Sequence, residues 1–248
     1  MATVAVSGAR GRLGSLVCEV VGEHPDFVLA ARLASDSDPD AGADAAILID
    51  VSHPDASPEI VERALRRGQR VIVGTSGWSA ARLDRLAEVI EELRSAGSDA
   101  AAVIVVPNFS LGSVIGTALA RIAAPYFDSV EIVEAHHDAK VDSPSGTAVR
   151  TAELIAEARR GRPVEAPFAA QRARGELIDG IPVHSLRMRG VVAKQEVRFG
   201  GTGEVLTVTH DTHSGDAYRA GVRAALEAIG STNGLVVGLD HVLGLARS

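Results

Sequence analysis

The chain has 248 residues, of which 46% are hydrophobic and 23% charged, which is enough for one large or two modest domains. Its net charge of -7 excludes the broad basic surface that neutralises nucleic-acid phosphates or attaches a protein to an acidic membrane. The single cysteine, Cys18, cannot form an internal disulfide, and no apolar run approaches the roughly 18 residues of a membrane span. We expect a cytoplasmic protein that binds neither nucleic acid nor membrane.

The first hundred residues alternate between short β-branched runs and longer stretches in which apolar residues recur at helical spacing. This alternation is typical of βαβ units and therefore of a parallel sheet. The predicted strands are 3–6, 27–33, 46–51, 70–73 and 103–106, and the helical stretches between them lie around 13–21, 60–65 and 83–93. A loop is expected from Ser35 to Asp44. Since crossovers between parallel strands are right-handed, the pattern predicts a Rossmann-type doubly wound parallel sheet in an α/β fold.

The pattern changes after Asn108. We expect helices at 112–123 and 147–160, a strand at 129–135, an irregular stretch from 161 to 179, and a hairpin formed by 195–199 and 204–210. Antiparallel pairing so late in the chain predicts a second, α+β domain with a mixed or antiparallel sheet. The last helix, 217–229, and the apolar run 235–239 are expected to rejoin the first sheet. The predicted domains are therefore 1–107 with 216–248, and 108–215.

A glycine-rich turn connects the first strand to the first helix. Gly8, Gly11 and Gly14 recur at three-residue spacing, which lets the backbone turn tightly and approach a pyrophosphate at the N-terminus of a helix. The position directly after the first strand is the one that a dinucleotide fingerprint requires. The predicted cofactor contacts here are Gly8, Ala9, Arg10, Gly11, Arg12 and Leu13.

The end of the second strand leaves the choice of cofactor open. An acidic residue about 20 residues after the glycines usually binds the ribose of NAD, but this strand ends in Leu33-Ala34-Ser35, and the nearest carboxylate is Asp36. Ser35 and Asp36 could reach the ribose from the loop. Alternatively, an arginine (Arg10, Arg12 or Arg32) accommodates a 2'-phosphate, and the cofactor is NADP. Both NADH and NADPH remain candidates.

Two further segments follow predicted strands of the first sheet. Gly74, Thr75 and Ser76 come after the fourth strand, and residues 106–109 come after the fifth. Open α/β sheets bind ligands at the carboxyl ends of their strands, so we expect cofactor or substrate contacts from both segments. The predicted contacts of the second segment are Val106, Pro107, Asn108 and Phe109.

Three ionisable side chains follow the strand 129–135. His136 and His137 are adjacent, and Lys140 comes three residues later. Histidine titrates near neutral pH and lysine is cationic, so together they can move a proton and attract an anion. In an extended backbone the two imidazoles project to opposite sides, so they cannot share one metal ion, and no metal site is predicted. His136 and Lys140 are the candidate catalytic residues.

A helix start follows these residues at Ser143-Pro144-Ser145-Gly146-Thr147. Proline fits a first helical turn, serine and threonine are capping residues, and glycine lets a ligand approach the backbone. Free N–H groups at this end would bind a carboxylate. Ser145, Gly146 and Thr147 are therefore candidate substrate contacts, and the chain as a whole predicts a dehydrogenase or reductase that acts on a small carboxylated substrate.

The segment from Glu134 to Ala148 resembles the signature of the dihydrodipicolinate reductase family, also called 4-hydroxy-tetrahydrodipicolinate reductases. Other parts of the chain resemble family blocks in the same order. They are residues 8–14, 50–54, 73–77, 107–110, 180–187, 195–200 and 209–211. The resemblance thus covers nearly the whole chain.

The resemblance implies a homotetramer that reduces 4-hydroxy-tetrahydrodipicolinate, a small dicarboxylate of diaminopimelate and lysine biosynthesis, with NADH or NADPH. It assigns His136 as proton donor or acceptor and Lys140 as proton donor, and it implies that His137, Gly146 and Thr147 contact the substrate. Two positions depart from the family pattern: Ala34 stands where many relatives carry the ribose-binding acid, and Gly215 where relatives usually carry arginine. The alternatives are a reductase of another small imine or keto acid, and a nucleotide-binding sensor without turnover.

Overall fold

The computed structural model of the chain describes residues 1–38, 40–98, 101–168 and 171–245. The chain forms two compact units, one made of Met1–Leu111 and Tyr218–Ser248 and the other of Gly112–Ala217. The sequence analysis placed these divisions four and two residues earlier, after 107 and 215. Residue 39 of the predicted loop and residues 246–248 of the predicted first domain lie outside the described residues. Each unit contains its own sheet.

The first unit is built on a six-stranded parallel sheet with the order β11-β5-β4-β3-β1-β2. Its central strands are runs of valine, isoleucine and alanine that are buried along most of their length, as expected where helices cover both faces. The strands are β1 Ala2–Ser7, β2 Phe27–Leu33, β3 Ile47–Asp50, β4 Arg70–Val73, β5 Ala102–Val105 and β11 Gly234–Val237. The predicted doubly wound sheet is confirmed, including the return of the chain's end to it as β11.

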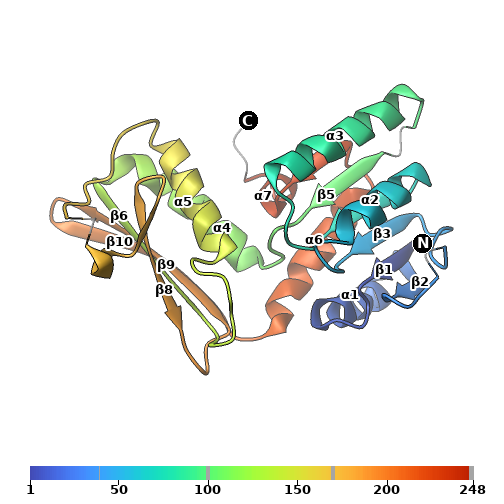
Figure 1. Cartoon of the computed structure of the whole chain (residues 1–248), viewed down its shortest axis with the longest axis horizontal. Coiled ribbons are helices and arrows are strands. Elements are labelled where there is room, and N and C mark those ends of the chain that lie inside the picture. Colours follow the sequence, from blue (N-terminus) through green and yellow to red (C-terminus); the bar gives the residue numbers. More distant parts are fainter. Residues whose placement is uncertain (39, 99–100, 169–170, 246–248) are drawn as a thin grey trace. The chain divides into compact units, whose positions relative to one another are not determined.

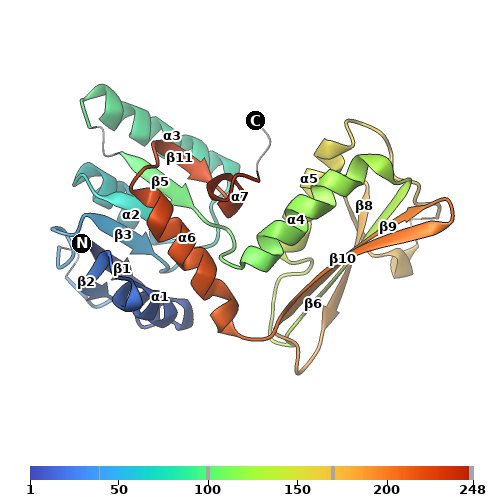
Figure 2. The ribbon, with the colours of Figure 1, turned by 180° about the vertical axis from the view of Figure 1, so that it is seen from behind.

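Helices cover both faces of this sheet (Figures 1 and 2). Helices α2 and α3 pack together over one face, and α1 and α6 pack together over the other. Cys18 lies on the buried face of α1, as predicted. The helices are α1 Arg12–Glu23, α2 Ser57–Arg66, α3 Ala80–Ser95, α6 Arg219–Ile229 and the short α7 Leu239–Val242.

The second unit contains a mixed five-stranded sheet with the order β10-β9-β6-β8-β7, in which only β6 and β8 are parallel neighbours. The strands are β6 Ser129–His136, β7 Glu176–Ile178, β8 Ile181–Arg187, β9 Ala193–Gly201 and β10 Glu204–Thr212. Helices α4 Leu111–Ala123 and α5 Gly146–Ala158 supply small apolar residues to a core with Ile132, Val183 and Phe199 from the sheet. The predicted α+β class and the hairpin are confirmed.

The stretch before β8 was predicted wrongly as irregular up to residue 179. Strand β7 lies within it and pairs with β8 across a two-residue turn, Asp179-Gly180, whose φ angles of 49° and 84° are both positive. An Asp-Gly pair favours this kind of turn because aspartate and glycine tolerate the left-handed conformation. Three residues are too few to show strand periodicity, so the dipeptide was the only local signal.

Helix α5 begins at Gly146, one residue before its predicted start at 147, but Pro144 lies outside its first turn. Pro144 was expected in the first helical turn, but it follows a cis peptide bond and precedes the N-cap residue, Ser145, so that the helix starts at Gly146. The side-chain oxygen of Ser145 accepts the N–H of Ala148 at 3.3 Å. A serine two residues before the predicted start caps the helix better than a proline inside it, because it satisfies a free backbone donor.

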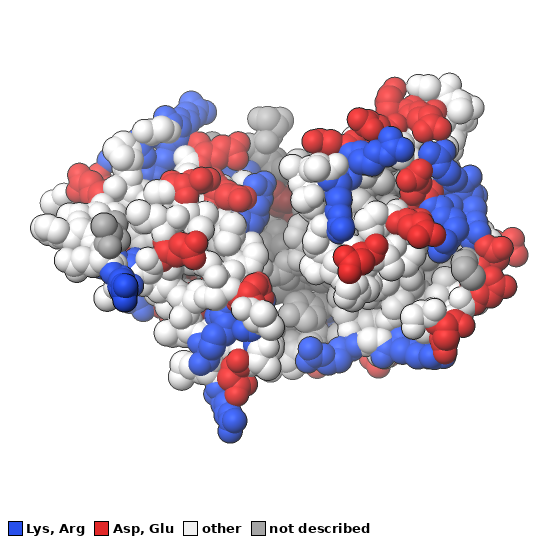
Figure 3. Space-filling view, in the orientation of Figure 1, with Lys and Arg blue, Asp and Glu red and all other residues white. Residues whose placement is uncertain are grey.

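The surface of both units carries mixed charge. On the face drawn in Figure 3, lysine and arginine side chains alternate with aspartate and glutamate. Among the described residues, no helix is both long enough and apolar enough to cross a membrane.

Candidate active site

The predicted cofactor segments meet at one edge of the parallel sheet. Strand β1 pairs with β2 on one side and with β3 on the other, so the strand order reverses at β1. In open α/β sheets ligands bind at the carboxyl ends of the strands next to such a reversal. A Cβ at Gly8 would overlap the carbonyl of Val51, and one at Gly74 would overlap the ring of Phe109 and touch Val51. The turns after β1, β4 and β5 therefore lie together around Val51.

The turn after β1 has the geometry of a phosphate cradle. Gly8 has a φ of 82°, and a Cβ at Gly14 would overlap the carbonyl of Gly8, so both positions require glycine. Within the described residues, helix α1 has no side-chain cap at Gly11 and no acidic residue in its first turn. The N–H groups of Arg12 and Leu13 thus lack both an intrahelical partner and a capping side chain. These features fit the pyrophosphate of a dinucleotide.

The other cofactor candidates divide into buried and exposed residues. Thr75 is buried, and its hydroxyl donates to the carboxylate of Asp50 at 2.8 Å, so it fixes the turn after β4 to the end of β3. Val106 and Phe109 are also buried. Ser76 and Pro107 are exposed, and Asn108 accepts the N–H of Ser110. Ser76, Pro107 and Asn108 are therefore the members of these two segments that can reach a ligand with their side chains.

An ion pair lies at the end of β2, where the sequence left the cofactor open. The guanidinium of Arg10 donates to the carboxylate of Asp36 at 2.8 Å, and both side chains are exposed. The hydrogen bond and charge of Arg10 hold the pKa of Asp36 below its usual value. The sequence offered two kinds of cofactor contact, a carboxylate that binds the ribose and an arginine that binds a 2'-phosphate. In the structure a candidate of each kind, Asp36 and Arg10, forms one ion pair.

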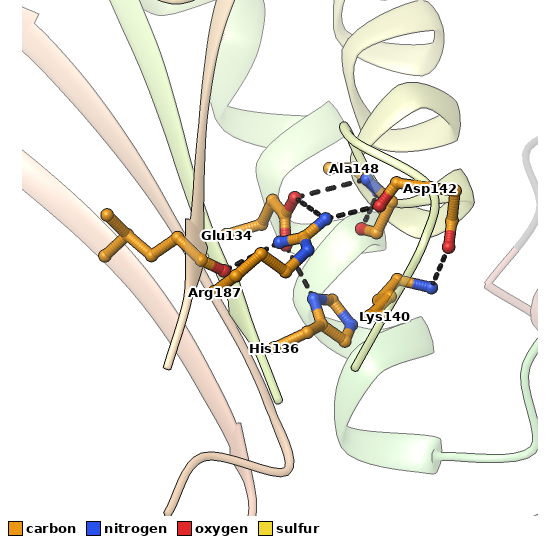
Figure 4. A network of polar contacts seen from close by, with 8 residues as sticks. Glu134, His136, Lys140, Asp142, Ala148 and Arg187 are labelled. Atoms are coloured by element: carbon orange, nitrogen blue, oxygen red, sulfur yellow. Dashed lines mark hydrogen bonds and ion pairs between the residues drawn. The ribbon is translucent and has the colours of Figure 1, made fainter. Parts of the chain in front are cut away.

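The candidate catalytic residues lie at and just after the end of β6 (Figure 4). His136 is the last residue of the strand, and its Nδ1 lies 2.6 Å from Oε2 of Glu134. A turn follows in which the N–H of Lys140 donates to the carbonyl of His137, and Nζ of Lys140 then lies 2.7 Å from Oδ1 of Asp142. The structure thus brings His136 and Lys140 close enough for their charges to interact.

The environment of His136 favours the neutral imidazole. Burial lowers its pKa, and together with the positive charges of Lys140 and Arg187 it outweighs the opposite influence of Glu134. Among the described residues, no group of three or more histidine, cysteine, aspartate or glutamate side chains is placed to hold a metal ion. Proton transfer and charge stabilisation are the chemistry that these side chains can perform.

The start of α5 is partly engaged by the protein itself. The N–H of Ser145 donates to Oε1 of Glu134, so Ser145 offers a substrate less than the sequence analysis expected. The N–H of Gly146 interacts with the carboxylate of Asp142, and beyond its chain neighbours and its own helix backbone no described atom lies within 4 Å of the place where a Cβ of Gly146 would be. The helix N-terminus therefore already attracts one carboxylate and leaves open space beside it.

Glu134 and Arg187 are residues of the site that were not predicted from the sequence. Arg187, on β8, binds both carboxylate oxygens of Glu134 at 3.0 Å and also donates to the carbonyl of Asp142. Glu134 could have been found from its spacing, because residues two apart on a strand share a face and His136 was already a candidate. Arg187 is far away in the chain and reaches the site only through the pairing of β6 with β8.

The first unit combines a parallel sheet with a glycine-rich turn that fits a pyrophosphate. The second unit carries an imidazole, an ammonium group and a helix N-terminus. Together these features are typical of a two-domain nicotinamide-dependent oxidoreductase. The comparisons with known proteins make this specific. Two sequence models match the chain, described as "Dihydrodipicolinate reductase, N-terminus" over residues 33–109 and "Dihydrodipicolinate reductase, C-terminus" over residues 112–243. The chain belongs to the dihydrodipicolinate reductase family, whose members are oxidoreductases that use NADH or NADPH.

Relatives and solved structures agree with this assignment. The chain is 51% identical over 247 residues to the 4-hydroxy-tetrahydrodipicolinate reductase of Clavibacter michiganensis subsp. michiganensis, covering 99% of this chain and 87% of the relative. It is 41% identical over 249 residues to that of Streptomyces coelicolor, covering 98% of each. The dipicolinate-bound dihydrodipicolinate reductase from Paenisporosarcina sp. TG-14 has a TM-score of 0.82 at 28% identity, over 97% of this chain and 99% of that one. The apo scyllo-inositol dehydrogenase from Lactobacillus casei, at 12% identity and a TM-score of 0.61 over 99% of this chain and 93% of that one, shares the fold.

Proposed function

We propose that the chain reduces 4-hydroxy-tetrahydrodipicolinate to tetrahydrodipicolinate with NADH or NADPH, a step of diaminopimelate and lysine biosynthesis. The observation that carries the proposal is the arrangement in the second unit, where His136 and Lys140 stand next to the start of α5 in a chain of this family. A planar dicarboxylate needs positive charge and backbone donors, and both are present there.

The proposed roles follow from the state of each group. The reduced nicotinamide, when bound, supplies hydride to the conjugated ring that remains after the substrate loses water. This addition leaves an anion conjugated with the ring nitrogen, which requires a proton and a positive neighbour. Lys140 supplies both. Burial lowers the pKa of His136, which favours the neutral ring, and a neutral ring can accept a proton or a hydrogen bond from the substrate.

Substrate and cofactor contacts complete the proposal. His137, Ser145, Gly146 and Thr147 bind the substrate carboxylates, with the N–H groups of α5 as the main donors. The residues of the turns after β1, β4 and β5 bind the dinucleotide. They are Gly8, Ala9, Arg10, Gly11, Arg12, Leu13, Gly74, Thr75, Ser76, Val106, Pro107, Asn108 and Phe109. In this account residues 1–107 and 216–248 form the dinucleotide-binding domain, and 108–215 the substrate-binding and oligomerisation domain.

An exposed apolar stripe supports a homotetramer. Ile115, Leu119 and Ile122 lie on one side of α4 and are 42%, 49% and 48% exposed. Leu206, on the edge strand β10 against which α4 packs, is 40% exposed. Contiguous exposed apolar residues are typical of a protein interface. Light scattering tests the assembly: we expect the mass of four chains, and a smaller mass for Leu119→Glu.

The reductase assignment is tested by an assay that follows the loss of nicotinamide absorbance with freshly generated substrate and each cofactor in turn. We expect oxidation of the cofactor that depends on this substrate. If the cofactor is oxidised only with a different imine or keto acid, that compound is the substrate. Cofactor binding without any oxidation would indicate a nucleotide sensor. A cytoplasmic location is proposed from the biosynthetic role, and cell fractionation with antibody detection tests it.

A further inference from the structure

Glu134 is a fully buried carboxylate for which the proposed reaction has no use. Its side chain, 0% exposed, lies on the same face of β6 as Ile132 and His136, the face covered by the helices. Burying a carboxylate costs several kcal/mol unless charged and polar groups compensate it. A glutamate at this place therefore needs a reason beyond filling the core.

The donors around Glu134 satisfy both of its oxygens (Figure 4). Oε1 accepts N–H groups from Ser145 at 3.2 Å and Arg187 at 3.0 Å, and Oε2 accepts from Arg187 at 3.0 Å and from His136 at 2.6 Å. Burial raises the pKa of Glu134, but the hydrogen bonds from Arg187, Ser185 and His136 outweigh it and hold that pKa below its usual value. The group is ionised at neutral pH and can only accept hydrogen bonds.

This state of Glu134 determines where the proton of His136 lies. An ionised carboxylate 2.6 Å from Nδ1 requires that Nδ1 carries the hydrogen. In a neutral imidazole the other nitrogen, Nε2, then has a free lone pair. The same carboxylate also binds the first backbone N–H of the α5 cap, so the ring and the helix start are fixed by one group.

We propose that Glu134 is the positioning residue of the site, which holds His136 in the Nδ1–H tautomer with Nε2 free for the substrate, and that Arg187 holds Glu134 in place. The proposal rests on the proposed function insofar as His136 acts on the substrate. The hydrogen bonds of Glu134 to Ser145 and Arg187 further tie β6, β8 and α5 together at the point where chemistry occurs.

Glu134→Gln is the informative substitution because it keeps the size of the side chain. An amide has one acceptor oxygen and one donor nitrogen, and here four N–H groups converge on the two positions. If the amide nitrogen faces His136, the ring must turn into the other tautomer, with Nδ1 accepting. If it faces Ser145, two donors oppose each other. In both orientations it also opposes one nitrogen of Arg187.

Glu131→Gln is a matched control on the same strand. Glu131 faces the opposite side of β6, and its Oε2 lies 2.6 Å from Nε2 of His184, so it also pairs with an imidazole and an arginine, Arg174. The control therefore removes the same charge from a similar group away from the candidate catalytic residues.

The experiment combines kinetics with a ring-tautomer measurement. Long-range ¹H–¹⁵N correlation spectra of histidine-labelled protein report the tautomer, and His136→Asn identifies the signal. We expect the Nδ1–H form of His136 in the wild type, a smaller population of that form in Glu134→Gln, and a decrease of kcat of about 100-fold. The KM for the cofactor should stay within about twofold, and Glu131→Gln should match the wild type in both readouts.

Two results would overturn the proposal. One is an Nε2–H tautomer of His136 in the wild-type protein, which decides the matter even if Glu134→Gln does not fold. The other is a folded Glu134→Gln protein with the kcat of Glu131→Gln. Failure of the proposed function would look different: the wild type would not oxidise the cofactor with this substrate, while the ring measurement would still report the tautomer.

Discussion

Nζ of Lys140 lies 2.7 Å from Oδ1 of Asp142, and the same carboxylate interacts with the N–H of Gly146. Burial raises the pKa of Asp142, but the hydrogen bond and charge of Lys140 outweigh it, and the group is held below its usual pKa. The carboxylate of Asp142 thus accepts from Lys140 and from the N–H of Gly146, the same two donors that we propose for the substrate.

Asp142→Asn should therefore strengthen substrate binding. In the variant no carboxylate of the protein offsets the positive charge of Lys140, so the substrate competes only with a neutral amide. We expect the KM for the substrate to fall by about twofold to fivefold, the range of a partly exposed ion pair. Initial-rate kinetics at saturating cofactor measure it. An increased KM would mean that Asp142 orients Lys140 rather than competing with the substrate.

Lys140→Ala should lower kcat by roughly two to four orders of magnitude, because it removes a proton donor and a charge contact. Affinity for the cofactor should change little, since all the proposed cofactor contacts lie in the first unit and Lys140 in the second. Stopped-flow turnover and fluorescence titration with NADH measure the two quantities. Lys194→Ala is the matched control, since Lys194 also pairs with a carboxylate, Glu196, at 2.7 Å. Turnover of Lys140→Ala equal to that of the control would end the assignment.

The acid limb of the pH profile should lie below the pKa of about 6.5 of a free histidine. Burial lowers the pKa of His136, and the neutral ring is the form that we propose to act. kcat/KM should therefore be constant above that pKa and fall about tenfold per pH unit below it. Profiles of the wild type and His136→Asn measure the limb, which the variant should lack. A rate that rises as the pH falls would show that the protonated ring is required.

Cofactor preference should depend on the pair of Arg10 and Asp36. Arg10→Ala removes the cation available to a 2'-phosphate and should lower kcat/KM for NADPH by about tenfold more than for NADH. Asp36→Ala should shift the ratio the other way, because it removes the carboxylate available to the ribose hydroxyls. The ratio of kcat/KM for the two cofactors measures both effects. An unchanged ratio in both variants would place the discrimination elsewhere, with Arg12 or Arg32 as the next candidates.

Gly14→Ala should destabilise the protein by about 1 to 3 kcal/mol, because its Cβ would overlap the carbonyl of Gly8 and force the turn to move. Cofactor affinity should fall with it. Gly22→Ala in the same helix is the control, since no described atom lies within 4 Å of its Cβ position, and it should stabilise the helix by up to about 1 kcal/mol. Thermal unfolding of both variants measures the difference. Equal stability would contradict the close packing of this turn.

The first unit could be predicted from local patterns because each βαβ segment carries its own signal. Strands β2 and β4 begin and end at the predicted residues, 27–33 and 70–73. In the second unit neither β7 nor β8 was predicted as a strand. Strand β7 has only three residues and exists only through its pairing with β8. Pairing over a long sequence distance leaves little trace in a local pattern.

The site was predictable to the extent that its residues are consecutive. His136, Lys140 and the α5 start lie within fifteen positions and could be selected by their chemistry. Arg187 could not, because it belongs to another strand and its role exists only when β6 and β8 pair. The engagement of Ser145 by Glu134 and of Lys140 by Asp142 likewise depends on side-chain conformations that residue types do not specify.

The most direct test of the central claim compares the wild type with the double variant His136→Asn/Lys140→Ala in the nicotinamide absorbance assay, at equal protein concentration and with the same freshly generated substrate. We predict that the wild type oxidises the cofactor in proportion to the substrate added, while the double variant binds the cofactor normally and turns over at least about 10⁴-fold more slowly. Equal rates in the two proteins would contradict the account.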